Sequence, residues 1–258
     1  MVKKDITTLD ILDAFQKVQT CPLCYLWTKS EERLMPHLLT NEVNMDPDFR
    51  AKVVNARGFC NRHMHLLYNT AYTPGSQDGL GYALYMLDVV KTLAENVQSV
   101  RLSIINVNTS GSRILGRREF AKLLKQAIMR LENNVKGTEE CPACEYLKQL
   151  DALRRGTLIR MLDEDVEFRE IFSKSRGFCI PHFMSLVKTA SDTKIKHQEI
   201  VLNLIFEVES KNIERLQTLL KKFIERFDWR REQKSYGEEV EANTIVKSVL
   251  KGVEGLQI

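Results

Sequence analysis

The sequence predicts an all-α protein made of two duplicated helical units, and three observations lead to this fold class. The 258 residues include only six prolines and twelve glycines, which is few for a turn-rich β architecture. Apolar residues recur at steps of three and four, and no segment alternates with period two over the length of a strand. One pattern of cysteine, histidine and neighbouring residues also occurs twice in the same order. We therefore expect pseudo-two-fold helical units, each with a Cys3His metal site and a long helix.

Caps, breakers and apolar spacing predict the elements of the first half. Asp46 followed by Pro47 is typical of a helix start, and Gly58 lies where that short helix should stop. Pro36 is expected to bend or end the helix that contains it. A first helix is capped by Thr8 or Asp10. The expected helices cover residues 8–18, 31–39, 47–57, 60–68 and 80–105.

The second half is expected to repeat this order. Residues 106–116 are rich in Asn, Ser, Thr and Gly, and they are the best candidate for a linker between the halves. The expected helices after it include residues 120–131, a long helix over 193–231 and a short amphipathic helix over 238–251. The predicted domains are residues 1–112 and residues 113–258, packed as one globular body.

The repeated pattern is Cys-Pro-x-Cys followed by Arg-Gly-Phe-Cys-x-x-His. The first motif recurs after 120 residues and the second after 119, and all six cysteines of the chain lie within the two copies. Two complete copies of the same cysteines and histidine are hard to explain by chance, so we interpret these side chains as metal ligands. The predicted ligands are Cys21, Cys24, Cys60 and His63 in the first half, and Cys141, Cys144, Cys179 and His182 in the second.

Three thiolates and one imidazole complete a tetrahedral shell, and zinc fits this ligand set best, with two ions per chain. Iron–sulfur clusters held by three cysteines and one histidine are the alternative. The motif of c-type haem attachment is absent, because Tyr25 and Glu145 stand where it requires histidine. We expect each metal to be structural and to join the two motifs of its own half.

The sequence gives little support for an enzyme. It has no nucleophile elbow, phosphate-binding loop, His-Glu-x-x-His or dinucleotide motif. A metal shell filled by four protein ligands also leaves no position for a substrate. The favoured function is therefore a non-catalytic interaction or adaptor module, or a nucleic-acid-associated one, and the alternative is a redox or iron sensor.

The partners remain open between protein and nucleic acid. The net charge of +4 permits an anionic partner. Basic residues gather in two segments, the second interleaved with aromatic residues, as phosphate binding with base stacking would require. A solvated face opposite a buried apolar stripe explains them as well, and we favour it. The candidate nucleic-acid contacts are Arg117, Arg118, Lys122, Lys221, Lys222, Arg226 and Arg230.

The apolar stripes of the long helices are wide enough for a homodimer interface. The N-terminal residues show no signal peptide, and no apolar stretch reaches the roughly 18 residues that span a bilayer. We therefore expect no membrane contact and a cytoplasmic location, where thiols stay reduced.

The paired Cys-Pro-x-Cys and Gly-Phe-Cys-x-x-His motifs, in a helical chain of this length, resemble a bacterial family found mainly in Firmicutes and classed as a domain of unknown function. The resemblance covers nearly the whole chain, and its specificity lies in the eight Cys and His positions. It implies a helical, metal-binding protein and carries no known reaction.

Overall fold

The computed structural model describes residues 5–17, 20–75, 79–111, 117–227 and 237–252. Within these ranges the chain is helical and contains no β-strand, which confirms the predicted all-α class. The chain forms two compact units, unit 1 from residues 1–31 with 147–258 and unit 2 from residues 32–146. None of the described helices is long and apolar enough to cross a membrane.

The helices of unit 1 enclose an apolar core. They are α1 (Ile6–Lys17), the start of α2 (Pro22–Leu38), most of α8 (Pro142–Glu164), α9 (Val166–Ser173), α10 (Ile180–Asp192), α11 (Gln198–Glu225), the 3-10 helix η1 (Glu238–Glu241) and α12 (Ala242–Lys251). Phe168, Phe172 and Phe178 are fully buried in this core. The ring centroids of Phe172 and Phe178 lie 5.6 Å apart, so the Phe of the second Gly-Phe-Cys motif is part of the core.

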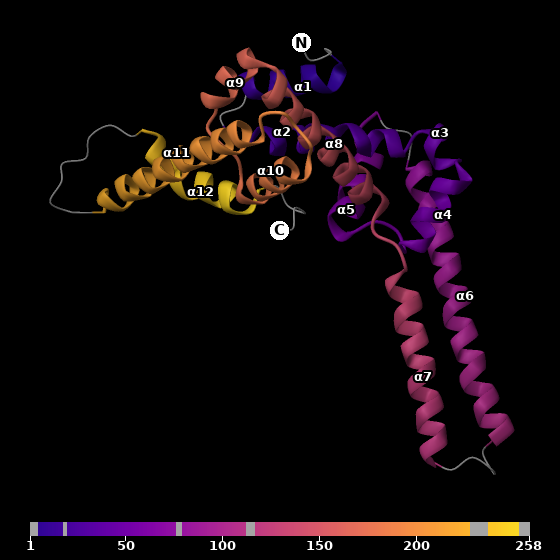
Figure 1. Ribbon diagram of the computed structural model, residues 1–258. Coiled ribbons are helices and arrows are strands. Elements are labelled where there is room, and N and C mark those ends of the chain that lie inside the picture. Colours follow the sequence, from indigo (N-terminus) through magenta and orange to yellow (C-terminus); the bar gives the residue numbers. More distant parts are fainter. Residues whose placement is uncertain (1–4, 18–19, 76–78, 112–116, 228–236, 253–258) are drawn as a thin grey trace. The chain divides into compact units, whose positions relative to one another are not determined.

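Unit 2 is built around a long helix. It contains the end of α2, then α3 (Asn41–Asn44), α4 (Pro47–Asn55), α5 (Asn61–Ala71), α6 (Leu80–Gly111), α7 (Arg117–Lys136) and the start of α8. Tyr85 of α6 is fully buried, and its hydroxyl donates to the Leu38 carbonyl at 2.7 Å. The rings of Phe49 and Phe59 pack against it. Beyond this core, α6 and α7 run side by side as an antiparallel hairpin (Figure 1).

Several predicted helix boundaries are wrong. The first helix is capped by Asp5, whose carboxylate accepts from the Thr8 backbone N–H at 2.8 Å, rather than by Thr8 or Asp10. The expected linker over 106–116 is helical as far as Gly111, and residues 112–116 lie outside the described residues. The expected helix over 193–231 begins only at Gln198, because the Asp163 carboxylate accepts the backbone N–H groups of Lys196 and His197 in the preceding turn.

The compact units also differ from the predicted domains, residues 1–112 and 113–258. Two helices cause the difference, since α2 and α8 each begin in one unit and end in the other. Each Cys-x-x-Cys motif lies at the start of one of these helices. The chain therefore places each Cys-x-x-Cys in a different unit from the Gly-Phe-Cys-x-x-His that follows it.

Candidate metal centres

Each Cys-x-x-Cys lies at the N-terminus of a helix. Cys21 directly precedes α2 and Cys141 directly precedes α8, and a proline occupies the first position of both helices, where no backbone N–H is needed. The carbonyl of the first cysteine accepts the N–H of the residue after the second, from Tyr25 and Glu145 respectively. Residues three apart on a helix lie on one side of it. The turn thus aims both sulfurs of a motif in one direction.

Each Gly-Phe-Cys-x-x-His also meets a helix start. Gly58 and Gly177 have φ angles of 100° and 83°, in the left-handed region that favours glycine. The chain then becomes extended at the next cysteine, which occupies the N-cap of α5 or α10. The histidine follows in the first helical turn. Cysteine sulfur and imidazole are thereby held about one turn apart and both point to the same place.

The first site lies in unit 1 and consists of Cys21, Cys24, Cys179 and His182, called site 1 below. His182 Nδ1 lies 3.4 Å from the Cys21 sulfur, 3.3 Å from that of Cys24 and 3.1 Å from that of Cys179. The sulfurs of Cys24 and Cys179 are 3.4 Å apart. Cys179 and His182 are fully buried, whereas Cys24 is partly exposed.

The second site lies in unit 2 and consists of Cys60, His63, Cys141 and Cys144, called site 2 below. His63 Nδ1 lies 3.2 Å from the Cys60 sulfur, 3.5 Å from that of Cys141 and 3.3 Å from that of Cys144. The sulfurs of Cys60 and Cys144 are 3.6 Å apart. His63 and Cys141 are buried, while the other two ligands are partly exposed.

The predicted grouping of the ligands within each half is therefore wrong, although the eight residues do form two groups of four. Each site joins the Cys-x-x-Cys of one half to the Cys-x-x-His of the other. The reason is the course of α2 and α8, which carry the chain out of the unit that holds their own first turn. A local loop of some 35 residues is not what a metal would close here.

The donor atoms of each group fit around a single metal ion. In both groups all four lie within 4.8 Å of one another. A tetrahedral ion with metal–sulfur bonds of about 2.3 Å and a metal–nitrogen bond of about 2.0 Å separates its donors by about 3.5–3.8 Å. The separations given above, from 3.1 to 3.6 Å, are close to this range. Two groups of Cys and His in this chain can therefore hold a metal ion.

The thiols also have the electrostatics of a cation site. Hydrogen bonds from Cys21 and Cys24 lower the pKa of Cys179 to about 4, while hydrogen bonding to Cys179 raises the pKa of Cys24. In site 2, a hydrogen bond from Cys144 lowers the pKa of Cys141 to about 3, and the pKa of Cys144 is raised in return. Crowded thiols cannot all ionise together. A divalent cation among them would remove that repulsion.

The similarity of this protein to a known family extends over nearly the whole chain. A family of unknown function, DUF6062, matches residues 2–253. The chain belongs to the DUF6062 family. The match includes all eight Cys and His residues of the two sites. No curated protein and no solved structure matches the chain.

Site 1 of this DUF6062 member is supported by buried polar residues. His182 Nε2, on the far side of the ring from the sulfurs, lies 3.2 Å from an Asp151 oxygen. Burial alone would lower the pKa of His182, but the negative charges of Cys21 and Asp151 outweigh it and raise the pKa to about 9. A carboxylate behind a ligating imidazole orients the ring and makes it a better ligand. Asp151 is thus placed to fix the Nδ1 of His182 toward the sulfurs.

Side chains of α11 hydrogen-bond to the backbone of the residue that precedes Cys179. The buried Glu209 carboxylate accepts the Phe178 N–H at 2.9 Å and an Asn212 amide N–H at 2.9 Å. That amide also donates to the Phe178 carbonyl at 3.3 Å. Both polar groups of the Phe178 backbone are satisfied inside the unit, and the position of Cys179 is fixed as a result.

Site 2 is supported by backbone contacts between its two arms. The Thr138 N–H donates to the Asn55 carbonyl at 2.9 Å, and the Asn55 amide donates to Glu139 at 3.1 Å. The Arg57 guanidinium donates to the carbonyls of Asn134 and Val54. These bonds tie the segment before Cys60 and His63 to the segment before Cys141 and Cys144. The two halves of site 2 therefore meet at the base of the α6–α7 hairpin.

Sequence reasoning missed Asp151 and Glu209. Asp151 had a usable signal, because an acidic residue, Glu31, stands 120 positions earlier, at the same offset as the Cys-x-x-Cys motifs. Glu31 is also buried. Glu209 had none, since valine occupies the corresponding positions of the first half, 89 and 90.

The described candidate nucleic-acid residues are divided between the two compact units. Lys122 is exposed on α7 in unit 2, whereas Lys221, Lys222 and Arg226 are exposed at the end of α11 in unit 1. The side chains of Arg117 and Arg118 and the whole of Arg230 lie outside the described residues. The aromatic residue Phe227, beside the α11 group, is 76% exposed and not part of a buried stripe.

Proposed function

We propose that the protein is a zinc-dependent helical interaction module, in which each of two zinc ions fixes its own compact unit. The observation that carries the proposal is the crossed ligand set. Cys24 and Cys179 are 155 positions apart in the chain, and Cys60 and Cys144 are 84 apart. A metal that joins such distant segments closes a long loop of the chain, and it stabilises the folded unit relative to the state in which that loop is open. This is the role of a structural ion.

The ligand shell supports a structural rather than a catalytic ion. A catalytic zinc keeps a coordination position for water or substrate, while a structural zinc has four protein ligands. Both groups supply three sulfurs and one imidazole nitrogen. The four donors would fill the shell, and the Asp151 carboxylate lies behind the ring of His182 rather than among the donors. Ligated thiolates also suit a cytoplasmic location, where thiols remain reduced.

Spacing favours a single ion over an iron–sulfur cluster, the basis of the alternative redox or iron sensor. A cluster inserts several irons and bridging sulfides between its protein ligands, so the ligands must spread apart. The donors of each group instead lie within 4.8 Å of one another. This distance suits the four corners around one ion.

The test is elemental analysis joined to an absorption spectrum of protein purified without oxygen. We expect a colourless protein with two zinc ions per chain. Replacement by cobalt should then produce the intense ligand-field bands of tetrahedral cobalt with thiolate ligands. A brown protein with iron, inorganic sulfide and broad absorbance near about 400 nm would replace zinc by clusters. Protein with neither metal after expression in zinc-supplemented medium would remove the metal from the proposal.

A second candidate function, nucleic-acid association, rests on the end of α11. Lys221, Lys222 and Arg226 are exposed there together with Phe227, and an exposed ring beside basic groups suits a stacked base near a phosphate. Single-stranded oligonucleotides should then bind in low salt and be released steeply as salt rises. The double variant Lys221→Glu with Lys222→Glu should abolish binding. The control variant Lys211→Glu, which changes a lysine nearer the middle of α11, should retain it. Absence of binding at low salt would end this candidate.

A further inference from the structure

The two sides of the α6–α7 hairpin differ in character. Val89, Leu93, Asn96, Val100 and Ile104 are the α6 residues turned toward the hairpin interior, all buried or half-buried. Their α7 counterparts are Phe120, Leu123, Ala127, Leu131 and Asn134, all half-buried. Each residue advances a helix by about 100°, so residues just before these positions face one side of the hairpin and residues just after them face the other.

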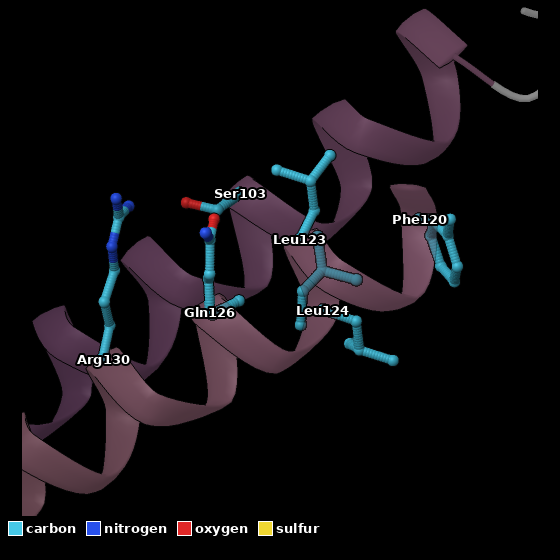
Figure 2. Close-up of a pocket in the computed structure, with 8 residues that line it drawn as sticks. Ser103, Phe120, Leu123, Leu124, Gln126 and Arg130 are labelled. Atoms are coloured by element: carbon cyan, nitrogen blue, oxygen red, sulfur yellow. The ribbon is translucent and has the colours of Figure 1, made fainter. Parts of the chain in front are cut away.

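One side of the hairpin is polar. The residues just before the interior positions are Asp88, Thr92, Glu95, Ser99 and Ser103 of α6, with Lys122, Gln126, Arg130 and Asn133 of α7. Ser103, Gln126 and Arg130 line one shallow pocket, and Figure 2 shows them on the same side of the two helices. Leu124 lines the same pocket from between the helices. Because both helices are right-handed and run antiparallel, the positions that precede the interior ones lie on the same face in both. The following positions must then share the opposite face.

That opposite face is apolar. It consists of Val90, Ala94, Val97, Arg101 and Ile105 of α6 with Ala121, Leu124, Ile128, Glu132 and Val135 of α7, and we call it the apolar face. All of these except the half-buried Leu124 are exposed. Val90, Val97 and Ile128 are each about half exposed or more. Eight apolar side chains thus lie in two adjoining stripes, and contiguous exposed apolar patches on soluble proteins commonly mark interaction sites.

The interior of the hairpin is only partly enclosed. From Leu93 onward, Val100 is the only buried side chain among the described residues of the two helices. Two helices packed alone leave their contact residues half exposed, whereas a four-helix bundle encloses them. The pattern of β-branched and small residues at steps of three and four is typical of helices that pack in such bundles. The apolar face needs two more helices with the same kind of stripe.

We propose that the apolar face binds the apolar face of a second copy of this chain, forming a four-helix bundle with its two-fold axis along the hairpin. Charge complementarity supports a second copy as the partner. The only charged residues of the apolar face are Arg101 on α6 and Glu132 on α7. With this axis, α6 of one copy lies opposite α7 of the other. The contact between Asn96 and Asn134 sets the register and places Arg101 about one helical turn from Glu132 of the second copy.

This inference does not depend on the metal, and its test uses the full chain with its metals retained. Analytical ultracentrifugation should show a reversible dimer at micromolar concentrations. Val97→Lys or Ile128→Lys should raise the dissociation constant about 100-fold or more, because each dimer buries the added charge twice. The matched controls are Ser103→Lys and Gln126→Lys on the polar side, which should leave the dimer unchanged. Circular dichroism should show equal helix content in all variants.

A charge exchange tests the arrangement itself. Arg101→Glu and Glu132→Arg should each weaken the dimer about tenfold, and the two together should restore it. A wild-type chain that stays monomeric at about 100 µM, a weak affinity for a specific dimer, would overturn the proposal. So would a dimer that tolerates Val97→Lys, a dimer that the control variants disrupt equally, or a monomer that binds a different protein through this face. If the double variant dimerised no more tightly than the single variants, the two-fold axis would not run along the hairpin.

Discussion

Sites 1 and 2 have the same ligand types, three cysteines and one histidine, and each combines one Cys-x-x-Cys with one Cys-x-x-His, but their surroundings differ. In site 1 three of the four ligands are buried, and Cys21 and Cys179 belong to the apolar core of the unit. In site 2 Cys60 and Cys144 are both partly exposed. Site 1 is supported by the side chains of Asp151, Glu209 and Asn212. Site 2 is supported mainly by backbone carbonyls that accept from Thr138 and Arg57.

The difference shows that the motif determines the shape of the ligand shell and the surrounding helices determine how firmly it is held. Backbone hydrogen bonds at the surface open more readily than polar side chains enclosed in a core. Site 2 also lies at the base of a hairpin whose far part has little interior. We therefore expect site 1 to be the more inert of the two and site 2 to respond first to chelators or strain.

The largest expected effect tests whether the ligand sets are crossed at all. Cys24→Ser with Cys179→Ser removes two ligands of site 1, so the variant should retain one zinc per chain. Cys24→Ser with Cys60→Ser removes one ligand from each site and should retain close to none. Both variants lack two thiols, so each is the control of the other. Elemental analysis after gel filtration measures the difference, and the opposite result would restore the grouping of ligands within each half.

Much of the local structure could be predicted from the sequence. The cap at Asp46 with Pro47 is confirmed, since the Asp46 carboxylate accepts the backbone N–H of Asp48 and Phe49. The eight Cys and His residues also come together in two groups of four. Caps and ligand turns depend on a few adjacent residues, and their signal is therefore visible in a short stretch of sequence.

The pairing of the motifs could not be predicted in the same way. It depends on α2 and α8 each passing from one unit to the other, and no single segment carries that information. Pro36, which was expected to bend or end its helix, lies inside α2, and the helix continues to Leu38. The break before α11 depends on Asp163, more than thirty residues away. Long-range structure therefore decided the pairing of the motifs and the start of α11, which the local pattern did not indicate.

Chelation should separate the two sites in time. With excess chelator, zinc release should have two phases, and the phase from site 2 should be at least about tenfold faster, because its partly exposed ligands open more easily. A chromophoric chelator such as 4-(2-pyridylazo)resorcinol follows both phases. Cys144→Ser should leave the slow phase alone, and Cys24→Ser should leave the fast one. Equal rates, or a faster site 1, would show that burial and side-chain support do not control metal release.

Asp151 should set the affinity of site 1 without being a ligand. Asp151→Asn removes the negative charge behind His182 and should weaken zinc binding at site 1 about 10- to 100-fold. The Cys144→Ser background isolates site 1 for a competition titration. The control is Asp163→Asn, which changes another buried carboxylate of α8 that binds backbone N–H groups of residues 196 and 197. It should lower stability but leave the zinc affinity unchanged. An equal loss of affinity in both variants would make the role of Asp151 merely structural.

The smallest effect compares the two glycines that precede the Phe-Cys of each motif. Both have positive φ, so an added methyl group costs about 1–2 kcal/mol of unfolding free energy at either position. At Gly58 the new carbon would lie 2.8 Å from the flexible end of Met64, which can move. At Gly177 it would lie 2.7 Å from Asn212, which is buried and hydrogen-bonded to the site 1 backbone. Gly177→Ala should therefore cost about 1–3 kcal/mol more than Gly58→Ala, as overpacking does.

Urea unfolding of the zinc-loaded variants measures this difference, and Gly156→Ala is the control. Gly156 lies within α8, and its added methyl group would have no neighbouring atom within 4 Å outside the helix backbone. Its replacement should therefore stabilise the helix by up to about 1 kcal/mol. Equal costs at the two motif glycines would mean that Asn212 yields as readily as Met64, and that the side chains around site 1 hold it no more firmly than the backbone contacts hold site 2.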